Sequence, residues 1–290
     1  MISALGADTP EISSAVTALF VGQHGIGVGI VIGSNIFNLA ALLGLSALFV
    51  GRLTIRRQGI IFNGVTSLIV ILVLILIIFG LISPLVSILL LMFLLIPYVI
   101  VSSLKPKRIK QWKLPENIQT FLVVAIASTR HASKGPKIVI KKSWPKVWLG
   151  VPAVIVIIAS SIGMVNSAVF LSDVWGVNKT ILGMLILATL TSIPNVITTI
   201  KLALDGRGMA VMSESLNSNT LNILFGICVP ATILGLGSLA KRTVFSVWWL
   251  LAASIIALSL LYFKKGFNRR SGAIIVGIYL VFVAIMIIWK

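Results

Sequence analysis

Long apolar runs, separated by short polar segments, occupy almost the whole chain. The runs at 58–80 and 84–104 carry no charged residue, and each reaches the roughly 20 residues that a helix needs to cross a bilayer. We expect membrane spans at 27–50, 58–80, 84–104, 148–171, 178–204, 209–237, 244–263 and 272–289, preceded by a half-length apolar segment at 8–22. The pattern predicts an all-α, polytopic membrane protein.

The connection at residues 105–147 interrupts this pattern. It is polar and strongly basic, and it contains Pro106, Pro115, Pro136 and Pro145. Its middle, "ENIQTFLVVAIAS", is typical of an amphipathic helix that lies on a membrane surface. A plain connector and a regulatory lipid-binding loop both fit this segment, and we favour the connector.

The composition supports a membrane protein and adds an orientation. Hydrophobic residues make up 58% of the chain and charged residues only 10%, against about 25% charged residues in soluble domains. The formal net charge is +18. Of the 24 Lys and Arg, only Lys179, Lys241, Arg242 and Lys290 lie in loops on the opposite side of the membrane from loop 105–147. Basic loops mark the cytoplasmic side. We therefore expect a multi-pass protein of the plasma membrane with a cytoplasmic loop 105–147, and no binding to nucleic acid.

An internal repeat relates the two halves of the chain. Residues 4–45 align with residues 188–229 without a gap. The identical pairs are Ala4/Ala188, Pro10/Pro194, Gly22/Gly206, Ser34/Ser218, Asn35/Asn219 and Asn38/Asn222. An odd number of predicted crossings separates the copies, so they should point in opposite directions. Inverted repeats with broken helices are typical of secondary transporters, whose ion sites lie near the midplane at the repeat interface.

The repeat also predicts the organisation of the chain. We divide it into a first inverted repeat at 1–104, a basic cytoplasmic loop at 105–147 and a second inverted repeat at 148–290, each repeat with about five helices. By this symmetry one helix and a half should precede Met1, so we expect the first repeat to be incomplete at its N-terminus.

The segments "ALGADTPE" (4–11) and "ATLTSIPN" (188–195) place a proline next to polar groups. A proline within a helix frees the carbonyl four residues earlier, and unpaired backbone at membrane depth is tolerated only where it lines a cavity or meets a partner. Asp8 and Glu11 share a helix face, and each would cost about 2.5–3.5 kcal/mol at the bilayer centre. Since neighbouring buried carboxylates repel, one must bind a proton or a cation. Carboxylate, carbonyl and amide oxygens are the ligands of Ca²⁺.

Two further segments supply oxygen atoms. In "GIVIGSNIFN" Ser34 and Asn38 are spaced i, i+4, and "SESLNSNTLN" repeats this spacing at Ser218 and Asn222. Glu214 lies one turn before Ser218 on the same stripe. It either compensates for the carboxylate absent from residue 195 or lies in water near the cytoplasmic mouth, and we favour the second interpretation.

Other polar and small residues in these segments have a packing interpretation. Asn35 and Asn219 are either cation ligands or partners in helix–helix hydrogen bonds. Gly25, Gly29 and Gly33 form a GxxxGxxxG face that predicts close helix packing.

The motifs resemble those of a known family. "ADTPE" followed by "GSNIFN", with Glu11 and Ser34 separated by 23 residues, resembles the first alpha-repeat of the sodium/calcium exchangers, which belong to the calcium/cation antiporter superfamily. "TSIPN" followed by "NSNTLN" is similar to a divergent second alpha-repeat at the same spacing. The resemblance covers the repeats by motif and the remaining spans by pattern. It implies a fold of ten helices with a cytoplasmic loop between the fifth and sixth, where loop 105–147 lies.

The resemblance also implies which residues bind cations. Glu11 matches the ion-coordinating glutamate, and Asn195 stands where its partner would be, so the charge there is replaced by an amide. Asp8 adds a carboxylate in the first copy, which places both negative charges on one repeat. The implied metal-binding set is Glu11, Asp8, Ala4, Ser34, Asn38, Ala188, Thr191, Ser192, Asn195, Ser218 and Asn222, with Ala4 and Ala188 acting through their carbonyls.

The implied function is secondary active antiport. Ca²⁺ would cross the membrane in exchange for Na⁺, or for H⁺ or K⁺, by alternating access, with inorganic cations and membrane lipid as partners, no catalytic site and no bound cofactor. The alternative is a non-transporting, degenerate relative with a structural or regulatory role in the membrane. An enzyme has little support, because His24 and His131 stand alone and Cys228 is the only cysteine. The sequence leaves the oligomeric state open.

Overall fold

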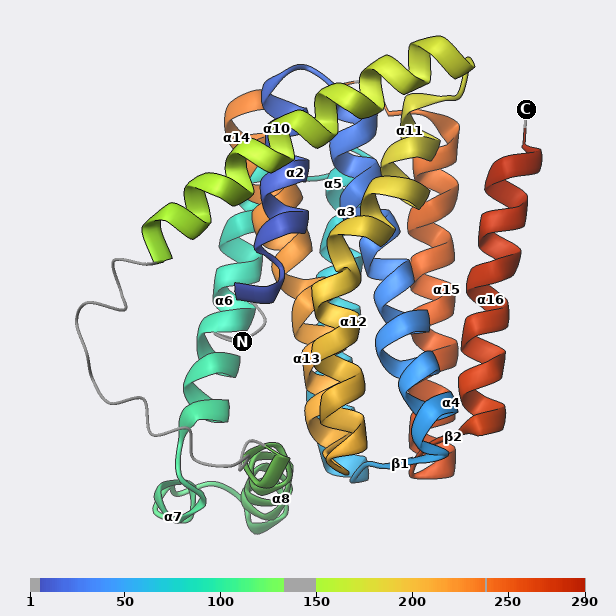
Figure 1. Cartoon of the computed structure of the whole chain (residues 1–290). Helices are drawn as coiled ribbons and strands as arrows, with labels where there is room; N and C mark the ends of the chain where they lie inside the picture. The colour runs from blue at the N-terminus through green and yellow to red at the C-terminus, as the bar shows by residue number, and fades with distance from the viewer. Residues whose placement is uncertain (1–5, 133–149, 238, 290) are drawn as a thin grey trace.

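The chain forms a bundle in which most of the long helices stand side by side, while α10 (Gly150–Trp175) lies obliquely across one end (Figure 1). The computed structural model describes residues 6–132, 150–237 and 239–289. The long helices of the first part are α2 (Thr9–Phe20), α3 (His24–Asn38), α5 (Arg57–Ile78) and α6 (Pro84–Ser103). Those of the second part are α10 (Gly150–Trp175), α12 (Ala188–Leu204), α13 (Gly208–Ile223), α15 (Lys241–Lys264) and α16 (Arg269–Ile288).

Seven helices of the described residues are long and apolar enough to cross a membrane. They cover 24–50, 57–78, 84–103, 155–175, 179–204, 241–264 and 269–288. Each overlaps a span predicted from the apolar runs, and the largest difference is at the fourth, predicted at 148–171. The remaining predicted span, 209–237, is helical through α13, η3 (Leu224–Cys228) and α14 (Val229–Leu234). It is not among the seven, because serine, asparagine and glutamate side chains lower the hydropathy of α13.

Some long helices are built from several segments. π-helical turns interrupt them, and such turns are frequent at functional sites. The first is η1 (Leu39–Leu45), between α3 and α4 (Ser46–Val50), and the second is η2 (Leu182–Leu187), between α11 (Lys179–Ile181) and α12. When the two copies of the repeat are aligned, η1 falls on η3. The two copies of the repeat therefore share a π-helical turn at equivalent positions.

The two copies of the repeat run in opposite directions, as the sequence predicts. In Figure 1, α2 rises from the middle of the bundle to the end where α3 begins. Its counterpart α12 descends to the opposite end, where α13 begins, and α13 then returns. The polar faces of the two copies therefore meet in the middle of the bundle.

The connections divide between the two ends of the bundle as expected. The lower end in Figure 1 holds α7 (Pro106–Ile109), α8 (Glu116–Ala132), the turn between α12 and α13, and a two-stranded sheet of β1 (Arg52–Thr54) and β2 (Gly266–Asn268). The strands are antiparallel, with Leu53 paired to Phe267. These are the basic connections of the sequence, so their common side is confirmed for the described residues. Lys290 and residues 133–149 of the predicted loop lie outside the described residues.

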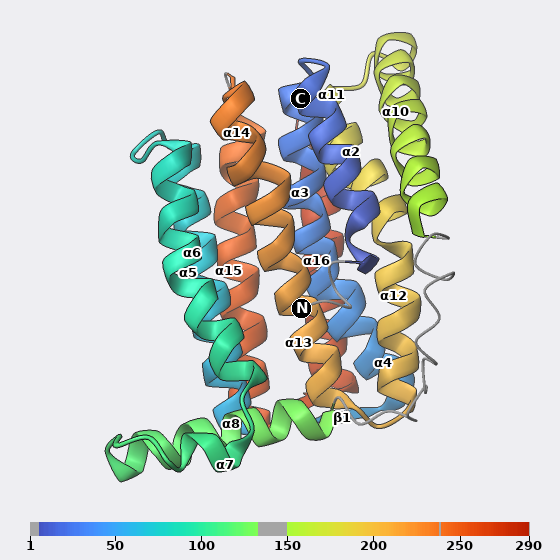
Figure 2. The ribbon, with the colours of Figure 1, turned by 90° about the vertical axis from the view of Figure 1, so that its left-hand side faces the viewer.

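Helices α7 and α8 lie across the lower end of the bundle rather than along it (Figure 2). The predicted amphipathic helix is present as α8, which buries Ala125 and Ile126, while Ile118 and the five basic residues between 105 and 113 are exposed. Contact with the membrane surface stays a prediction.

Glycines bring the helices of the two repeats together. A Cβ atom at Gly25 would lie 2.8 Å from Thr180 Oγ1, and one at Gly29 would lie 3.0 Å from the Thr180 carbonyl oxygen. At Gly33 it would overlap the backbone of Met184. The predicted GxxxGxxxG face is confirmed, and it packs α3 directly on α11 and η2.

Candidate cation site

The first copy of the repeat places two carboxylates in the protein interior. Helix α2 begins at Thr9, and the carbonyl of Asp8 accepts a hydrogen bond from Ile12 N at 3.0 Å. Pro10 has no N–H to donate to a preceding turn, so the chain turns at Asp8 before the helix starts. The side chains of Asp8 and Glu11 are both fully buried. The predicted break in the helix is confirmed for this copy.

The second copy differs, and here the prediction of a broken helix is wrong. Helix α12 continues through Pro194 without interruption. In this turn the Thr191 hydroxyl lies 2.9 Å from the carbonyl of Leu187 and 3.2 Å from that of Ala188, the local side-chain to backbone bonding typical of threonine within a helix. The irregular backbone of this copy lies one turn earlier, in η2.

Asn195 joins the two copies at the centre of the bundle. Its Nδ2 lies 2.8 Å from Asp8 Oδ1, 2.8 Å from Glu11 Oε1 and 3.3 Å from Ser218 Oγ. Ser218 Oγ in turn donates a hydrogen bond to Asp8 Oδ1. An amide nitrogen has only two hydrogens, so these three acceptors exceed what it can satisfy. The NH₂ group lies between the two carboxylates and bonds both.

Several buried oxygen atoms at this centre have no hydrogen-bond partner among the described residues. They are Asp8 Oδ2, Glu11 Oε2, Ser192 Oγ, Asn195 Oδ1, Asn38 Oδ1 and Asn222 Oδ1. An unsatisfied buried acceptor costs about 1–3 kcal/mol, and carboxylate, amide and hydroxyl oxygens are the ligands that hard cations prefer. The residues present therefore fit a bound cation. The described residues contain no group of three or more His, Cys, Asp or Glu that could hold a metal ion, so a cation at this centre would need amide and hydroxyl ligands as well.

Asn35 and Asn219 form a symmetric pair next to this centre. Each side-chain Nδ2 donates to the backbone carbonyl of the other, at 3.1 Å and 3.0 Å. The same symmetry holds one turn later: Asn38 Nδ2 donates to Asn219 Oδ1 at 3.1 Å, and Asn222 Nδ2 donates to Asn35 Oδ1 at 3.2 Å. All four amides are buried. Helix–helix hydrogen bonding is thus the role that the structure gives to Asn35 and Asn219.

The remaining predicted ligands lie around the same centre, with one exception. Ser34 Oγ donates to the carbonyl of Ala188 at 3.4 Å, which places the first copy's serine on the second copy's helix. Thr191 and Ser192 are buried on α12. Ala4 lies outside the described residues.

Glu214 is buried. Its side chain is only 7% exposed. The expectation that it lies in water near the mouth of the protein is therefore wrong. Glu214 lies on α13. Four helices, α3, α5, α8 and α12, pack against α13 and keep the Glu214 side chain away from solvent.

A second buried polar cluster was not predicted from the sequence. Tyr98 Oη lies 2.7 Å from Asn63 Oδ1 and 3.1 Å from Asn217 Oδ1, and its ring stacks on Phe62. The cluster joins α5, α6 and α13. Asn63 and Tyr98 are polar residues within otherwise apolar spans, and this feature of the sequence could have predicted the cluster.

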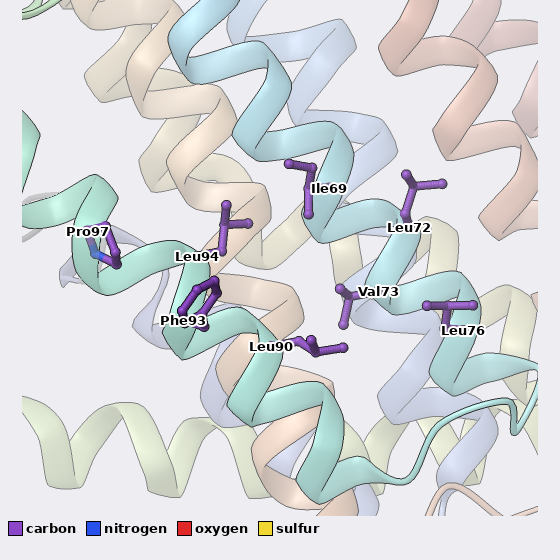
Figure 3. A pocket seen from close by; sticks show the side chains of 8 residues that line it. All are labelled: Ile69, Leu72, Val73, Leu76, Leu90, Phe93, Leu94 and Pro97. Atoms are coloured by element: carbon purple, nitrogen blue, oxygen red, sulfur yellow. The ribbon is translucent and has the colours of Figure 1, made fainter. Parts of the chain in front are cut away.

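Two hollows differ in what they could hold. One, about 550 Å³ between α5 and α6, is lined by apolar side chains and offers no ligand to a cation (Figure 3). The smaller, about 230 Å³, lies between α2, α10 and α12 and is bounded by Pro10 and Pro194, with Ser14, Ser160 and Ser161 on its wall. This second hollow adjoins the turn of the first copy that carries Asp8 and Glu11.

Comparison with known proteins identifies the family. The model of the family described as "Sodium/calcium exchanger protein" matches residues 1–104 and 146–288. The chain belongs to the sodium/calcium exchanger family. Members of this family are transporters of inorganic cations rather than enzymes, so the chain is an antiporter-type membrane protein.

Individual relatives agree with this membership. CaxA, a candidate antiporter of Alkalimonas amylolytica, is 24% identical over 283 residues, which cover 93% of this chain and 79% of CaxA. Sodium/potassium/calcium exchanger 2 of Gallus gallus is 29% identical over 121 residues, 39% of this chain and 19% of that exchanger.

Solved structures share the fold. Native YfkE superimposes with a TM-score of 0.65 at 15% identity, covering 98% of this chain and 81% of YfkE. The sodium–calcium exchanger NCX_Mj superimposes with a TM-score of 0.62 at 19% identity, covering 98% of this chain and 84% of NCX_Mj. The all-α fold of the exchangers is thus confirmed.

Proposed function

We propose that this exchanger moves Ca²⁺ across the plasma membrane in exchange for Na⁺, H⁺ or K⁺, by alternating access of its two inverted repeats. The proposal rests chiefly on one observation: the carboxylates of Asp8 and Glu11 are fully buried side by side, and among the described residues no Lys or Arg forms a salt bridge with either. They are held instead by neutral donors such as the Asn195 amide, which bonds both. Ionised groups at membrane depth are costly and generally mark ion pathways.

The Asn195 side chain gives this site two arrangements. A flip of the amide about its Cβ–Cγ bond exchanges Nδ2 for Oδ1. In one orientation the NH₂ group donates to the carboxylates, and in the other the carbonyl oxygen faces the space between them. The first suits the ion-free protein, and the second supplies a ligand to Ca²⁺ together with Asp8 and Glu11. Asn38, Asn222 and Ser192 offer further oxygens.

Alternating access would follow from the inverted arrangement. The site lies where α2 and α3 of one copy meet α12 and α13 of the other, so movement of one copy against the other changes the side from which the site is open. The hollow between Pro10 and Pro194 adjoins it and is a route by which ions could enter. We place loop residues 105–132 on the cytoplasmic side because of their basic charge.

The test is ion flux in proteoliposomes containing the purified protein. We expect Ca²⁺ uptake that depends on an outward gradient of Na⁺, H⁺ or K⁺. Glu11→Gln and Asp8→Asn should each reduce it by a hundredfold or more, because each removes one of two charges that bind the divalent ion. Glu116→Gln, which changes an exposed carboxylate on α8, is the matched control and should transport like the wild type.

Wild-type protein that carries no Ca²⁺ under any of the three gradients would overturn the proposed function. Ca²⁺ transport unchanged by Glu11→Gln would overturn the assignment of the site. No observation on the described residues favours the alternative of a non-transporting relative.

A further inference from the structure

Helix α13 is bonded through two consecutive side chains to helices on different sides. It packs between α5 on one side and α12 on the other (Figure 2). Ser218 donates a hydrogen bond to Asp8 at the candidate cation site, whereas Asn217 contacts Tyr98 of α6. Consecutive side chains of an α-helix project about 100° apart. A contact that fixes Asn217 therefore also fixes the direction in which Ser218 points.

Tyr98 is itself held in one orientation. Its ring stacks on Phe62, with the ring centroids 5.1 Å apart and the planes 21° from parallel. Its hydroxyl oxygen lies 2.7 Å from Asn63 Oδ1. The Asn63 amide is oriented in turn, because its Nδ2 donates to the Gly59 carbonyl at 2.8 Å. The Tyr98 hydroxyl is therefore presented to α13 from a fixed place on the α5–α6 pair.

The Tyr98 hydroxyl can bond both asparagines at once. A hydroxyl has one hydrogen to donate and can also accept. The hydrogen goes to Asn63 Oδ1, which is the shorter contact. Asn217 Oδ1 lies 3.1 Å from the same hydroxyl oxygen, and a turn of the Asn217 amide about its Cβ–Cγ bond would bring Nδ2 there as a donor. The donors would then run without a gap from Asn217 through Tyr98 and Asn63 to the Gly59 carbonyl.

Packing alone does not call for these polar groups. Helices α5 and α6 are otherwise strongly apolar, and the side chains of Asn63, Tyr98 and Asn217 are all buried. A buried polar group is costly unless it is hydrogen-bonded. A buried network whose members are all bonded fixes one arrangement of the elements that carry it. This network therefore fixes α13 against α5 and α6 more specifically than apolar side chains would.

The internal repeat gives the same role to the equivalent position of the first copy. The residue equivalent to Asn217 is Gly33, which directly precedes Ser34. Gly33 lies so close to Met184 that a Cβ atom would overlap its backbone, and Ser34 donates to the Ala188 carbonyl of the other copy at 3.4 Å. In both copies the residue just before the serine holds its helix against a neighbour. The first copy does so by close backbone contact and the second by a hydrogen bond.

We propose that Tyr98 is a positioning residue for the cation site: by bonding Asn217 it fixes the rotation of α13 that turns Ser218 towards Asp8. This inference rests on the proposed function, and it assigns a role in cation affinity to a residue of α6, outside both copies of the repeat. Without the hydroxyl, α13 would have to be ordered when the cation binds, and the cost of that ordering would lower the affinity.

The experiment measures equilibrium binding of ⁴⁵Ca²⁺ to the detergent-purified protein, together with its thermal unfolding. Tyr98→Phe keeps the ring that stacks on Phe62 and removes only the hydroxyl. We expect it to raise the Kd for Ca²⁺ about fivefold, the change that corresponds to one lost hydrogen bond. Asn217→Ala removes the other member of the contact and should raise the Kd by a similar factor. Either variant tests the proposal if the other does not fold.

Tyr262→Phe is the matched control. It makes the same chemical change on α15, where Tyr262 uses its ring: the Arg57 guanidinium lies 5.0 Å from the ring centroid, and the Phe263 ring packs edge-on at 5.5 Å. A phenylalanine keeps both contacts. The control should leave the Kd for Ca²⁺ unchanged.

A double-mutant cycle with Ser218 separates positioning from general destabilisation. Ser218→Ala removes the hydroxyl that Tyr98 is proposed to orient. In that background Tyr98→Phe should raise the Kd further by less than about twofold, because the group that it positions is already absent. If Tyr98→Phe instead raised the Kd by its full factor in the Ser218→Ala background, the two residues would act independently, and the proposal would be overturned.

The other results are equally decisive. Tyr98→Phe that lowers the unfolding temperature but binds Ca²⁺ like Tyr262→Phe would show that the hydroxyl only stabilises the fold, and would overturn the positioning role. Wild-type protein that binds Ca²⁺ saturably but transports none would overturn the proposed function alone, because the binding cycle tests Tyr98 without transport. Wild-type protein without saturable Ca²⁺ binding would overturn both.

Discussion

The amide nitrogen of Asn195 lies 2.8 Å from the carboxylate of Glu11, the residue to which the internal repeat relates it. Two residues at equivalent places of an inverted repeat thus meet at the pseudo-twofold axis, one as donor and the other as acceptor. Had both been glutamates, they would repel in the absence of a cation. The asymmetry of the sequence therefore gives the ion-free site an internal hydrogen bond.

Asn195→Asp should make the protein depend on cations for stability. The change removes the donor and puts a third carboxylate beside Asp8 and Glu11, which we expect to lower the free energy of unfolding of the ion-free protein by roughly 1–3 kcal/mol. Added Ca²⁺ should restore it. Thermal unfolding in detergent, with chelator and with Ca²⁺, measures both effects.

The matched control for that variant is Asn178→Asp. Asn178 caps α11 by accepting a hydrogen bond from Thr180 N at 2.9 Å, and an aspartate accepts equally well. If Ca²⁺ stabilised both variants against thermal unfolding by the same amount, this result would contradict a specific role for Asn195.

Asn35 and Asn219 should be energetically coupled. Their reciprocal side-chain to backbone bonds tie α3 to α13. Asn35→Ala and Asn219→Ala should each destabilise the protein by about 0.6–2 kcal/mol, the usual range for polar contacts between membrane helices. The double variant should cost less than the sum, because either single change already loosens the α3–α13 contact across which the other bond forms. Strict additivity in the unfolding free energies would show that the pair acts independently.

Gly33→Ala should destabilise the contact between the two repeats. A Cβ atom there overlaps the Met184 backbone, which cannot move without displacing η2, and overpacking of this kind costs roughly 1–3 kcal/mol. Gly163→Ala in α10 is the control, because a Cβ at Gly163 has nothing within 4 Å. It should be neutral or stabilise by up to about 1 kcal/mol. Equal unfolding midpoints for the two variants would contradict the close packing.

The basic end of the bundle should be cytoplasmic. In a Cys228→Ala background, Lys107→Cys reports the end that holds α7, and Asp173→Cys reports the opposite end, where Asp173 is 66% exposed. A membrane-impermeant thiol reagent should label position 107 in inside-out vesicles only and position 173 in right-side-out vesicles only. The reverse pattern would invert the topology.

Hydropathy and the repeat by themselves determined most of the architecture. Apolar runs of spanning length can satisfy their backbone only as helices in a bilayer, so the membrane helices followed from the pattern. The alignment of the two copies placed Glu11 opposite Asn195 and Asn35 opposite Asn219 before any contact was known, because equivalent residues of an inverted repeat meet near its axis.

Only the tertiary structure decided the roles that depend on what lies opposite each side chain. The sequence allowed Asn35 and Asn219 to be ligands or helix partners, and their mutual hydrogen bonds assign them to the second role. It did not predict that Tyr98 reaches Asn63 and Asn217, since that contact depends on the register of three helices. Pro194 leaves α12 continuous, whereas Pro10 stands at a break, and the sequence does not distinguish the two prolines. Glu214 is buried because other helices cover α13, and a helix's own sequence does not determine what packs on it.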